Sequence, residues 1–261
     1  MPDKKPQLIL TGHKPMQRTY ERIRSYYLND DSNLEQPETR RDLVDPGFPR
    51  KLLGGYAHFR KTRLSRERER YEQLAETGQK PDTMIIACCD SRSAPETIFG
   101  TAPGEIFVVR NVANIMPPYE SDGHYHGTSA ALEFAVQALK VKHIVIMGHG
   151  RCGGIDAFRR QISGETAEPL SPGNFIGKWI SLLEPVARNV ERTGEETAEE
   201  LQWKLETGSI RQSIEHLKTF PCVSILLERE QIGLHGAWFD ISSGELWTMN
   251  NDTGEFEQPF A

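Results

Sequence analysis

Three short apolar runs constrain the fold of this chain more than any other feature of its sequence. They cover residues 84–89 (MIIACC), 106–110 (IFVVR) and 143–148 (HIVIMG), and a helix is predicted over 128–140 between the second and the third. Continuous apolar runs of this length, linked through helical segments, are typical of parallel β-strands buried on both faces. We therefore expect an α/β core built on a parallel sheet.

Two later segments are expected to end the sheet. Residues 233–240 (GLHGAWFD) and 245–250 (ELWTMN) are joined by ISSG, and a short connection of this kind is typical of a β-hairpin. The predicted fold class is α/β, with a mainly parallel central sheet of four strands and an antiparallel edge strand, flanked by helices and preceded by an N-terminal helical extension.

The first 80 residues differ in character from the rest. They are polar, with aromatic and aliphatic residues at helical intervals, as between Tyr20 and Tyr27, and they hold no core of their own. The basic run at 60–70 includes glutamates and is interpreted as a solvated helix face. A second exposed, acidic helix is expected at 191–206. The predicted organisation is an extension at 1–80 and an α/β domain at 81–261.

Charge and cysteine content limit the function classes. The net charge is −6, from 31 Lys and Arg against 37 Asp and Glu, so nothing attracts the chain as a whole to nucleic acid or anionic lipid. The apolar stretch at Leu8–Leu10 is too short for a signal peptide, and no later stretch has membrane-spanning length. We expect a cytoplasmic protein that binds neither nucleic acid nor membranes. Four cysteines are too few for a disulfide framework, and clustered cysteines then indicate metal binding or catalysis.

Chemically versatile side chains follow two of the predicted strands. Cys88 and Asp90 lie in MIIACCDSR, and His149 and Cys152 lie in HIVIMGHGRCGG. Ligands of parallel sheets gather beyond the carboxyl ends of the strands, so these residues are expected to lie close together. Two thiolates and one imidazole are a ligand set suited to tetrahedral Zn²⁺.

The fourth coordination position separates a structural from a catalytic zinc site, because structural sites are closed by four protein ligands. Cys222 lies far away in an apolar segment and is better interpreted as a small core residue. Asp90 could close the site, but Arg92 is a natural partner for its carboxylate. The pattern favours an open, catalytic site.

Three further residues are given structural or surface interpretations. Cys89 faces away from Cys88 along an extended strand and is expected to be a packed thiol in the core. His124 and His126 lie in the segment SDGHYHG without a third partner and are expected to be solvated.

The pattern C-x-D-S-R, followed about sixty residues later by H-x-x-C-G-G, resembles the β-class carbonic anhydrases. The similarity runs from Gln79 to Ile155 and includes the segments PGEIFVVRNVAN, PPY and GTSAALEFAV. It implies that 81–261 is a zinc-binding catalytic domain with one Zn²⁺ per chain, held by Cys88, His149 and Cys152.

The resemblance also implies an activity, the reversible hydration of CO₂ to bicarbonate and a proton by zinc-bound hydroxide. Asp90 and Arg92 match the catalytic dyad that orients the hydroxide, and Gly153 matches the position whose backbone amide helps to hold bicarbonate. Two alternatives stay open: hydrolysis of carbonyl sulfide or carbon disulfide at the same site, and a catalytically silent zinc-binding interaction module.

Substrate-binding residues and a homo-oligomer are implied in the same way. Phe107, Val112 and Phe134 occupy positions that line the CO₂ pocket of the family, and Gln79 matches a glutamine that reaches the substrate across a dimer interface. The segment 1–80 would then be a dimerisation arm, in a homodimer that could assemble further into a tetramer.

Some bacterial members of the family have a closed form in which the dyad aspartate takes the fourth zinc position, stabilised by bicarbonate in a separate pocket of tryptophan, arginine and tyrosine. This sequence keeps the arginine as Arg110 but has Ile85 and Phe239 at the other two positions. Two anion contacts are therefore missing, and the site is expected to stay open with Asp90 off the metal.

Overall fold

The computed structural model describes residues 18, 20–25, 47–121, 126–166, 171, 175–190 and 194–260. The chain divides into two compact units, Met1–Arg66 with Pro169–Gly177, and Glu67–Glu168 with Lys178–Ala261. In the first unit, residues 20–25 are helical, and the helix α3 covers Arg50–Lys61. Neither α3 nor the next helix, α4 (Arg63–Thr77), contains a buried residue. The basic run at 60–70 therefore forms a solvated helix surface, as expected.

The second unit is built on one six-stranded sheet with the order β2-β1-β3-β4-β5-β6. The four strands β1 to β4 are parallel, and β5 and β6 add two antiparallel strands at one edge. Their bounds are Thr83–Cys88 for β1, Ile106–Asn111 for β2, His143–His149 for β3, Gly233–Phe239 for β4, Leu246–Met249 for β5 and Phe256–Glu257 for β6.

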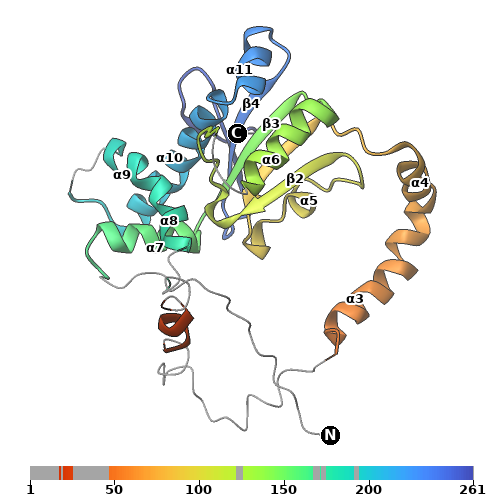
Figure 1. Cartoon of the computed structure of the whole chain (residues 1–261), viewed down its shortest axis with the longest axis horizontal. Coiled ribbons are helices and arrows are strands. Elements are labelled where there is room, and N and C mark those ends of the chain that lie inside the picture. Colours follow the sequence, from red (N-terminus) through yellow and green to blue (C-terminus); the bar gives the residue numbers. More distant parts are fainter. Residues whose placement is uncertain are drawn as a thin grey trace, which may run out of the picture. The chain divides into compact units, whose positions relative to one another are not determined.

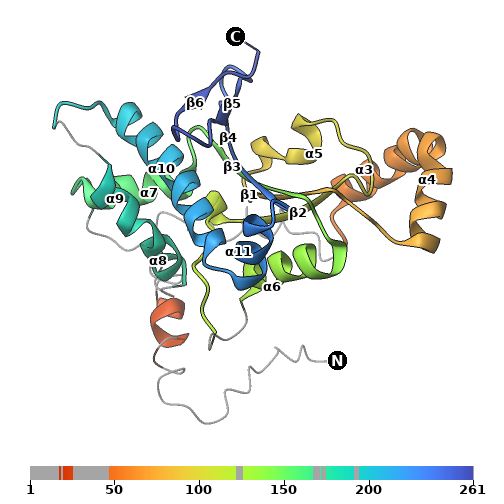
Figure 2. The same ribbon diagram turned by 90° about the horizontal axis from the view of Figure 1, so that it is seen from above.

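Helices cover both faces of the sheet. Figure 2 shows α6 and α11 on one face and α5 on the opposite face, and the long helix α10 packs on β3 and β4 (Figure 1). The helices are α5 (Pro95–Ile98), α6 (Gly127–Glu133) with a π-helical turn at Phe134–Leu139, α7 (Gly153–Ile162), α8 (Phe175–Ile180), α9 (Glu184–Asn189), α10 (Ala198–Lys218) and α11 (Pro221–Glu228).

Each face of the sheet has its own apolar cluster. The larger one joins Met84, Ile86 and Ile144 of the strands to Ile210 and Leu217 of α10. Within the described residues, no helix combines the length and the apolar character that crossing a lipid bilayer requires.

The strand predictions from the apolar runs are confirmed, including the hairpin that places β5 antiparallel to β4. The short strand β6 was not predicted, because two residues carry no recognisable alternation. The prediction of an exposed acidic helix at 191–206 is wrong in its bounds and in its exposure. The helix α10 begins only at Ala198 and buries Leu201, Gln202, Leu205 and Glu206, because its acidic residues surround an apolar face that packs on the sheet.

The contact between β3 and α10 depends on a residue without a side chain. A Cβ at Gly148 would lie 2.8 Å from Ile210 Cδ1, closer than carbon atoms approach one another. Gly148 pairs with Trp238 of β4 and immediately precedes His149, so this close approach sets how tightly the end of β3 packs under α10.

We predict that Gly148→Ala lowers the free energy of unfolding by about 1–3 kcal/mol, because the added methyl group overpacks the contact with Ile210. Urea denaturation measures the change. Gly127→Ala is the matched control, since Gly127 is exposed at the start of α6 and a Cβ there meets nothing within 4 Å. Equal stabilities for the Gly148→Ala variant and the wild type would show that α10 has room to move.

Candidate metal centre

The strand pairing brings the predicted metal ligands together. The parallel strands β1 and β3 are adjacent, with Ala87 opposite Met147, so Cys88 and His149 leave the sheet at the same edge. Cys152 follows at the start of α7. The two Sγ atoms of Cys88 and Cys152 are 3.9 Å apart, and these atoms and a ring nitrogen of His149 all lie within 4.8 Å of one another. All three residues are buried.

His149 is held in the orientation that a metal ligand needs. Its Nδ1 lies 2.9 Å from the carbonyl oxygen of Gly150, which accepts a hydrogen bond and so fixes the proton on Nδ1. The other nitrogen, Nε2, is buried and has no hydrogen-bond partner. A buried acceptor without a partner, next to two sulfur atoms, fits a metal ion that all three residues would share.

The electrostatics of the two sulfurs also fit a cation. The contact with the Cys152 thiol, together with His149 and the Asp90 amide, lowers the pKa of Cys88 to about 4. The same contact and burial raise the pKa of Cys152. The two shifts have opposite directions because two adjacent buried thiolates would repel each other, a repulsion that a bound cation would relieve. Zn–S bonds of about 2.3 Å in tetrahedral geometry place two sulfurs about 3.8 Å apart, which agrees with the spacing here.

Asp90 and Arg92 form a bidentate ion pair beside this cluster. Arg92 Nε donates to Asp90 Oδ1 at 3.0 Å, and Arg92 Nη2 donates to Asp90 Oδ2 at 2.7 Å. The backbone amide of Arg92 donates a third hydrogen bond to Oδ1. These contacts hold the pKa of the Asp90 carboxyl well below its usual range. The carboxylate is therefore oriented by its own loop.

Arg110 holds the backbone around Cys88 and Asp90, a role that the sequence did not predict. From β2, its Nε donates to the carbonyl oxygen of Cys88 at 2.7 Å, and its Nη2 donates to that of Asp90 at 2.6 Å. Ile85 belongs to the apolar cluster on the second face of the sheet, and Phe239 packs against that cluster. Arg110 therefore fastens the loop that carries Cys88 and Asp90, and its apolar neighbours at positions 85 and 239 offer no hydrogen bonds to an anion.

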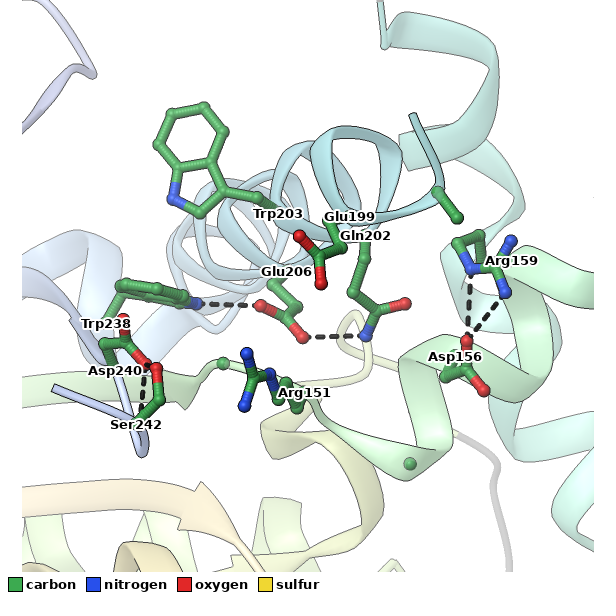
Figure 3. Close-up of a pocket in the computed structure, with 13 residues that line it drawn as sticks. Arg151, Asp156, Arg159, Glu199, Gln202, Trp203, Glu206, Trp238, Asp240 and Ser242 are labelled. Carbon is green, nitrogen blue, oxygen red and sulfur yellow. Dashed lines mark hydrogen bonds and ion pairs between the residues drawn. The ribbon is translucent and has the colours of Figure 1, made fainter. Parts of the chain in front are cut away.

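The helix α10 carries a buried polar group, the Glu206 carboxylate, which Figure 3 shows between Gln202 and Trp238. Glu206 accepts hydrogen bonds from the Cys152 amide at 3.0 Å, from Gln202 Nε2 at 2.7 Å and from Trp238 Nε1 at 3.0 Å. Burial raises the pKa of Glu206, and these donors act in the opposite direction. Glu206, Gln202 and Trp238 line part of a cavity of about 540 Å³. In the sequence, Gln202 and Glu206 are recognisable as neighbours on one face of a helix by their spacing of four residues, but this spacing does not reveal that they are buried.

The structure separates the predicted substrate-binding residues into two sets. Gly153 adjoins Cys152, and Val112 lies beside the following residue, Gly154, where an added Cβ would meet Val112 Cγ1 at 2.9 Å. Phe107 packs against Phe134 with ring centroids 5.9 Å apart.

Phe107, Phe134 and Gln79 belong to the second set, which lies away from the metal ligands of the same chain. Phe107 precedes Asn111, the register partner of Cys88, by four residues, which is about 13 Å along β2. Gln79 is exposed and precedes the far end of β1.

The remaining predictions for cysteine and histidine have mixed outcomes. The prediction that Cys89 is packed in the core is wrong: Cys89 is exposed, because β1 ends at Cys88 and the strand alternation does not continue. Cys222 is half-buried and packs against the larger apolar cluster, as expected. His126 is half-buried before α6, and His124 lies outside the described residues.

Comparison with known proteins identifies the family. The sequence profile of the carbonic anhydrases matches residues 83–246, more than half of the chain. The chain is 34% identical over 200 residues to beta carbonic anhydrase 5, chloroplastic, of Arabidopsis thaliana, across 74% of this chain and 62% of that protein. It is 32% identical over 216 residues to a carbonic anhydrase of Synechococcus elongatus, across 80% of this chain and 76% of that protein.

Solved structures agree in fold. The β-carbonic anhydrase CcaA matches with a TM-score of 0.73 at 29% identity, over 80% of this chain and 91% of that chain. A tetrameric β-carbonic anhydrase from Sordaria macrospora matches with a TM-score of 0.65 at 27% identity, over 77% of this chain and 96% of that chain. Fold and profile define the carbonic anhydrase class of enzymes. Within that class, the chain belongs to the β-carbonic anhydrase family, which uses zinc, and its Cys-His-Cys group fits that metal.

Proposed function

We propose that this protein catalyses the reversible hydration of CO₂ to bicarbonate and a proton, with one zinc ion held by Cys88, His149 and Cys152. The observation that carries the proposal is the buried, unpartnered Nε2 of His149 beside two sulfur atoms 3.9 Å apart. Three protein ligands leave a fourth position for water, which is the arrangement of catalytic zinc sites.

Zinc in this position supplies a Lewis acid that makes water a nucleophile near neutral pH. The chain's own residues then orient that nucleophile. Asp90 Oδ1 already accepts two hydrogen bonds from Arg92, whereas Oδ2 accepts one and keeps a lone pair for another donor. We assign that lone pair to the O–H of the attacking water, so that its oxygen faces the carbon of CO₂.

Arg92 would keep Asp90 off the metal. Its two side-chain hydrogen bonds to Asp90 would have to break before the carboxylate could become the fourth ligand. Arg110 is already committed to the carbonyl oxygens of Cys88 and Asp90, and Ile85 and Phe239 pack in an apolar environment. These contacts support an open site that bicarbonate does not close.

The substrate pocket is proposed to be completed by a second copy of the chain. Val112 and Gly153 would line it beside the metal, and Phe107, Phe134 and Gln79 would come from the partner, because they lie too far from the metal ligands of their own chain. Phe134 is 51% exposed, and Leu52, Leu53 and Tyr56 of α3 are at least half exposed, which supports burial against another subunit. The relatives from Sordaria macrospora are tetrameric β-carbonic anhydrases.

The names of the relatives favour CO₂ over carbonyl sulfide or carbon disulfide as substrate, since the proteins compared above are carbonic anhydrases. The intact ion pair between Asp90 and Arg92 argues against a silent zinc-binding module, which needs no oriented carboxylate. A cytoplasmic location stays a prediction, and the Arabidopsis relative is named chloroplastic.

We expect about one zinc per chain in the purified protein, and loss of most of it in Cys152→Ser, because a serine hydroxyl is a poor zinc ligand. Elemental analysis after removal of loosely bound metal measures this. Cys89→Ser is the matched control, since Cys89 is exposed and outside the Cys-His-Cys group. Active wild-type protein without zinc would refute the assigned site.

Asp90→Asn is expected to keep its zinc and to lose about 10²–10⁴-fold in kcat/KM for CO₂ hydration, the range by which a positioned proton acceptor accelerates a reaction. Stopped-flow hydration with a pH indicator measures the rate, and parallel assays with carbonyl sulfide and carbon disulfide test the alternative substrates. Asp82→Asn, which removes an exposed carboxylate paired with Lys142, is the control and should stay active. Full activity of zinc-loaded Asp90→Asn would exclude the dyad.

The native protein should have at least twice the chain mass of 29.6 kDa by light scattering. If Gln79 serves the partner's zinc site, Gln79→Ala and Cys152→Ser should each impair their homodimers. Co-expression of the two variants should restore activity, because the mixed dimer contains one complete site. An active monomer, or a failure of the mixed dimer to recover, would contradict the shared pocket.

A further inference from the structure

We propose that Glu206 and Gln202 are positioning residues of the metal centre, which fix the backbone of Cys152 and place a buried carboxylate charge behind the zinc ligands, and so slow the release of the ion. The inference rests on the proposed zinc site and concerns how that site retains its metal.

The two side chains hold both polar backbone groups of Cys152. The Cys152 amide donates to Glu206 Oε1 at 3.0 Å, and Gln202 Nε2 donates to the Cys152 carbonyl oxygen at 3.1 Å. Gln202 Nε2 also donates to Glu206 Oε1 at 2.7 Å, so the two residues, one helical turn apart on α10, brace each other. Cys152 is thereby tied to a 21-residue helix that begins with a capping box at Thr197.

The loop before Cys152 needs such a restraint. Arg151 has a φ of 57°, a left-handed conformation that is unfavourable for a residue with a Cβ. A strained residue of this kind persists only where its surroundings hold it in place. The hydrogen bonds from α10 act on the next residue and thus keep Cys152 Sγ directed toward Cys88 and His149.

The hydrogen bond from Gln202 to Cys152 leaves one polar atom of the Gln202 side chain unsatisfied. Its Nε2 donates to the Cys152 carbonyl oxygen and to Glu206, and its Oε1 is buried without a hydrogen-bond partner. Turning the amide over would set Oε1 against these two acceptors and would leave both of them without their shared donor, Nε2. An unsatisfied acceptor kept in this way indicates that the contact with Cys152 has a role beyond filling space.

The hydrogen-bond pattern at Glu206 is that of a carboxylate. Its three partners, the Cys152 amide, Gln202 Nε2 and Trp238 Nε1, are all N–H donors, and they use both of its oxygens. Glu206 is 3% exposed and forms no ion pair in the described part of the chain. A dication held by Cys152 is then a nearby positive charge for it, and in a poorly hydrated site the attraction stabilises the occupied state.

The test is the rate at which folded, zinc-loaded protein transfers its ion to an excess of a chromogenic chelator. Glu206→Gln should release zinc about 10–100-fold faster than wild type, the range found when groups that support metal ligands are removed. Glu199→Gln, an exposed carboxylate one turn before Gln202 and Trp203 on the same helix, should release zinc at the wild-type rate. Circular dichroism establishes that each variant is folded, and the spectrum of the Co²⁺-substituted protein reports the geometry of the ligands.

A second substitution separates charge from hydrogen-bond geometry. In Glu206→Gln, the new amide group faces the Trp238 indole N–H, and two donors oppose each other. The double variant Glu206→Gln with Trp238→Phe has no such conflict but still lacks the negative charge. Fast release of zinc should therefore persist in it. Return of the double variant to the wild-type rate would overturn the role of the charge.

If Glu206→Gln does not fold, Gln202→Met is the alternative test variant. It removes the donor to the Cys152 carbonyl oxygen and keeps Glu206. It should also release zinc faster than wild type. Wild-type release rates from folded Glu206→Gln or Gln202→Met would overturn the proposal. A wild-type protein without zinc, or Cys152→Ser with full zinc, would instead refute the zinc site itself, so the two failures are distinguishable.

Discussion

The parallel pairing of β1 with β3 is the interaction on which the candidate site depends. With Ala87 opposite Met147, the strands end together, and Cys88 and His149 emerge at one edge of the sheet. A shift of one residue in this register would turn the side chains of one strand to the opposite face and separate the two ligands. The apolar residues on both faces of β1 are buried, so the packing that stabilises the sheet also opposes such a shift.

Around this pairing, each loop of the centre is fastened by a different element. Arg110 of β2 holds the carbonyl oxygens that follow β1, Arg92 holds Asp90, and the carbonyl oxygen of Gly150 holds the His149 ring. The helix α10 holds Cys152 from behind through Glu206. The metal ligands are therefore positioned by groups that do not bind the metal themselves.

The sequence was sufficient for the part of the structure that repeats regularly. Apolar runs predicted β1, β2 and β3, and the positions of Cys88, His149 and Cys152 after those runs predicted the cluster at the carboxyl edge. The same reasoning failed for Cys89, because strand alternation was extended one residue beyond the end of β1.

It failed for Glu206 for another reason. An acidic helix has the same sequence pattern whether a given carboxylate faces water or three buried N–H donors, and only the packing of α10 on β3 and β4 decides between them. For Arg110 likewise, the sequence indicates only a residue at the end of a strand. Its hydrogen bonds to the carbonyl oxygens of Cys88 and Asp90 are visible only in the structure. Contacts between residues far apart in the chain left no local pattern to detect.

The separation of the three ligands along the chain couples metal occupancy to folding. Cys88 lies at the end of one strand, and His149 and Cys152 follow another, so the unfolded chain has no preformed site. An ion that binds only the folded form shifts the folding equilibrium by mass action, in proportion to the logarithm of its free concentration. The melting temperature of this protein is therefore expected to rise with the concentration of free zinc, because the bound ion would stabilise the folded form alone.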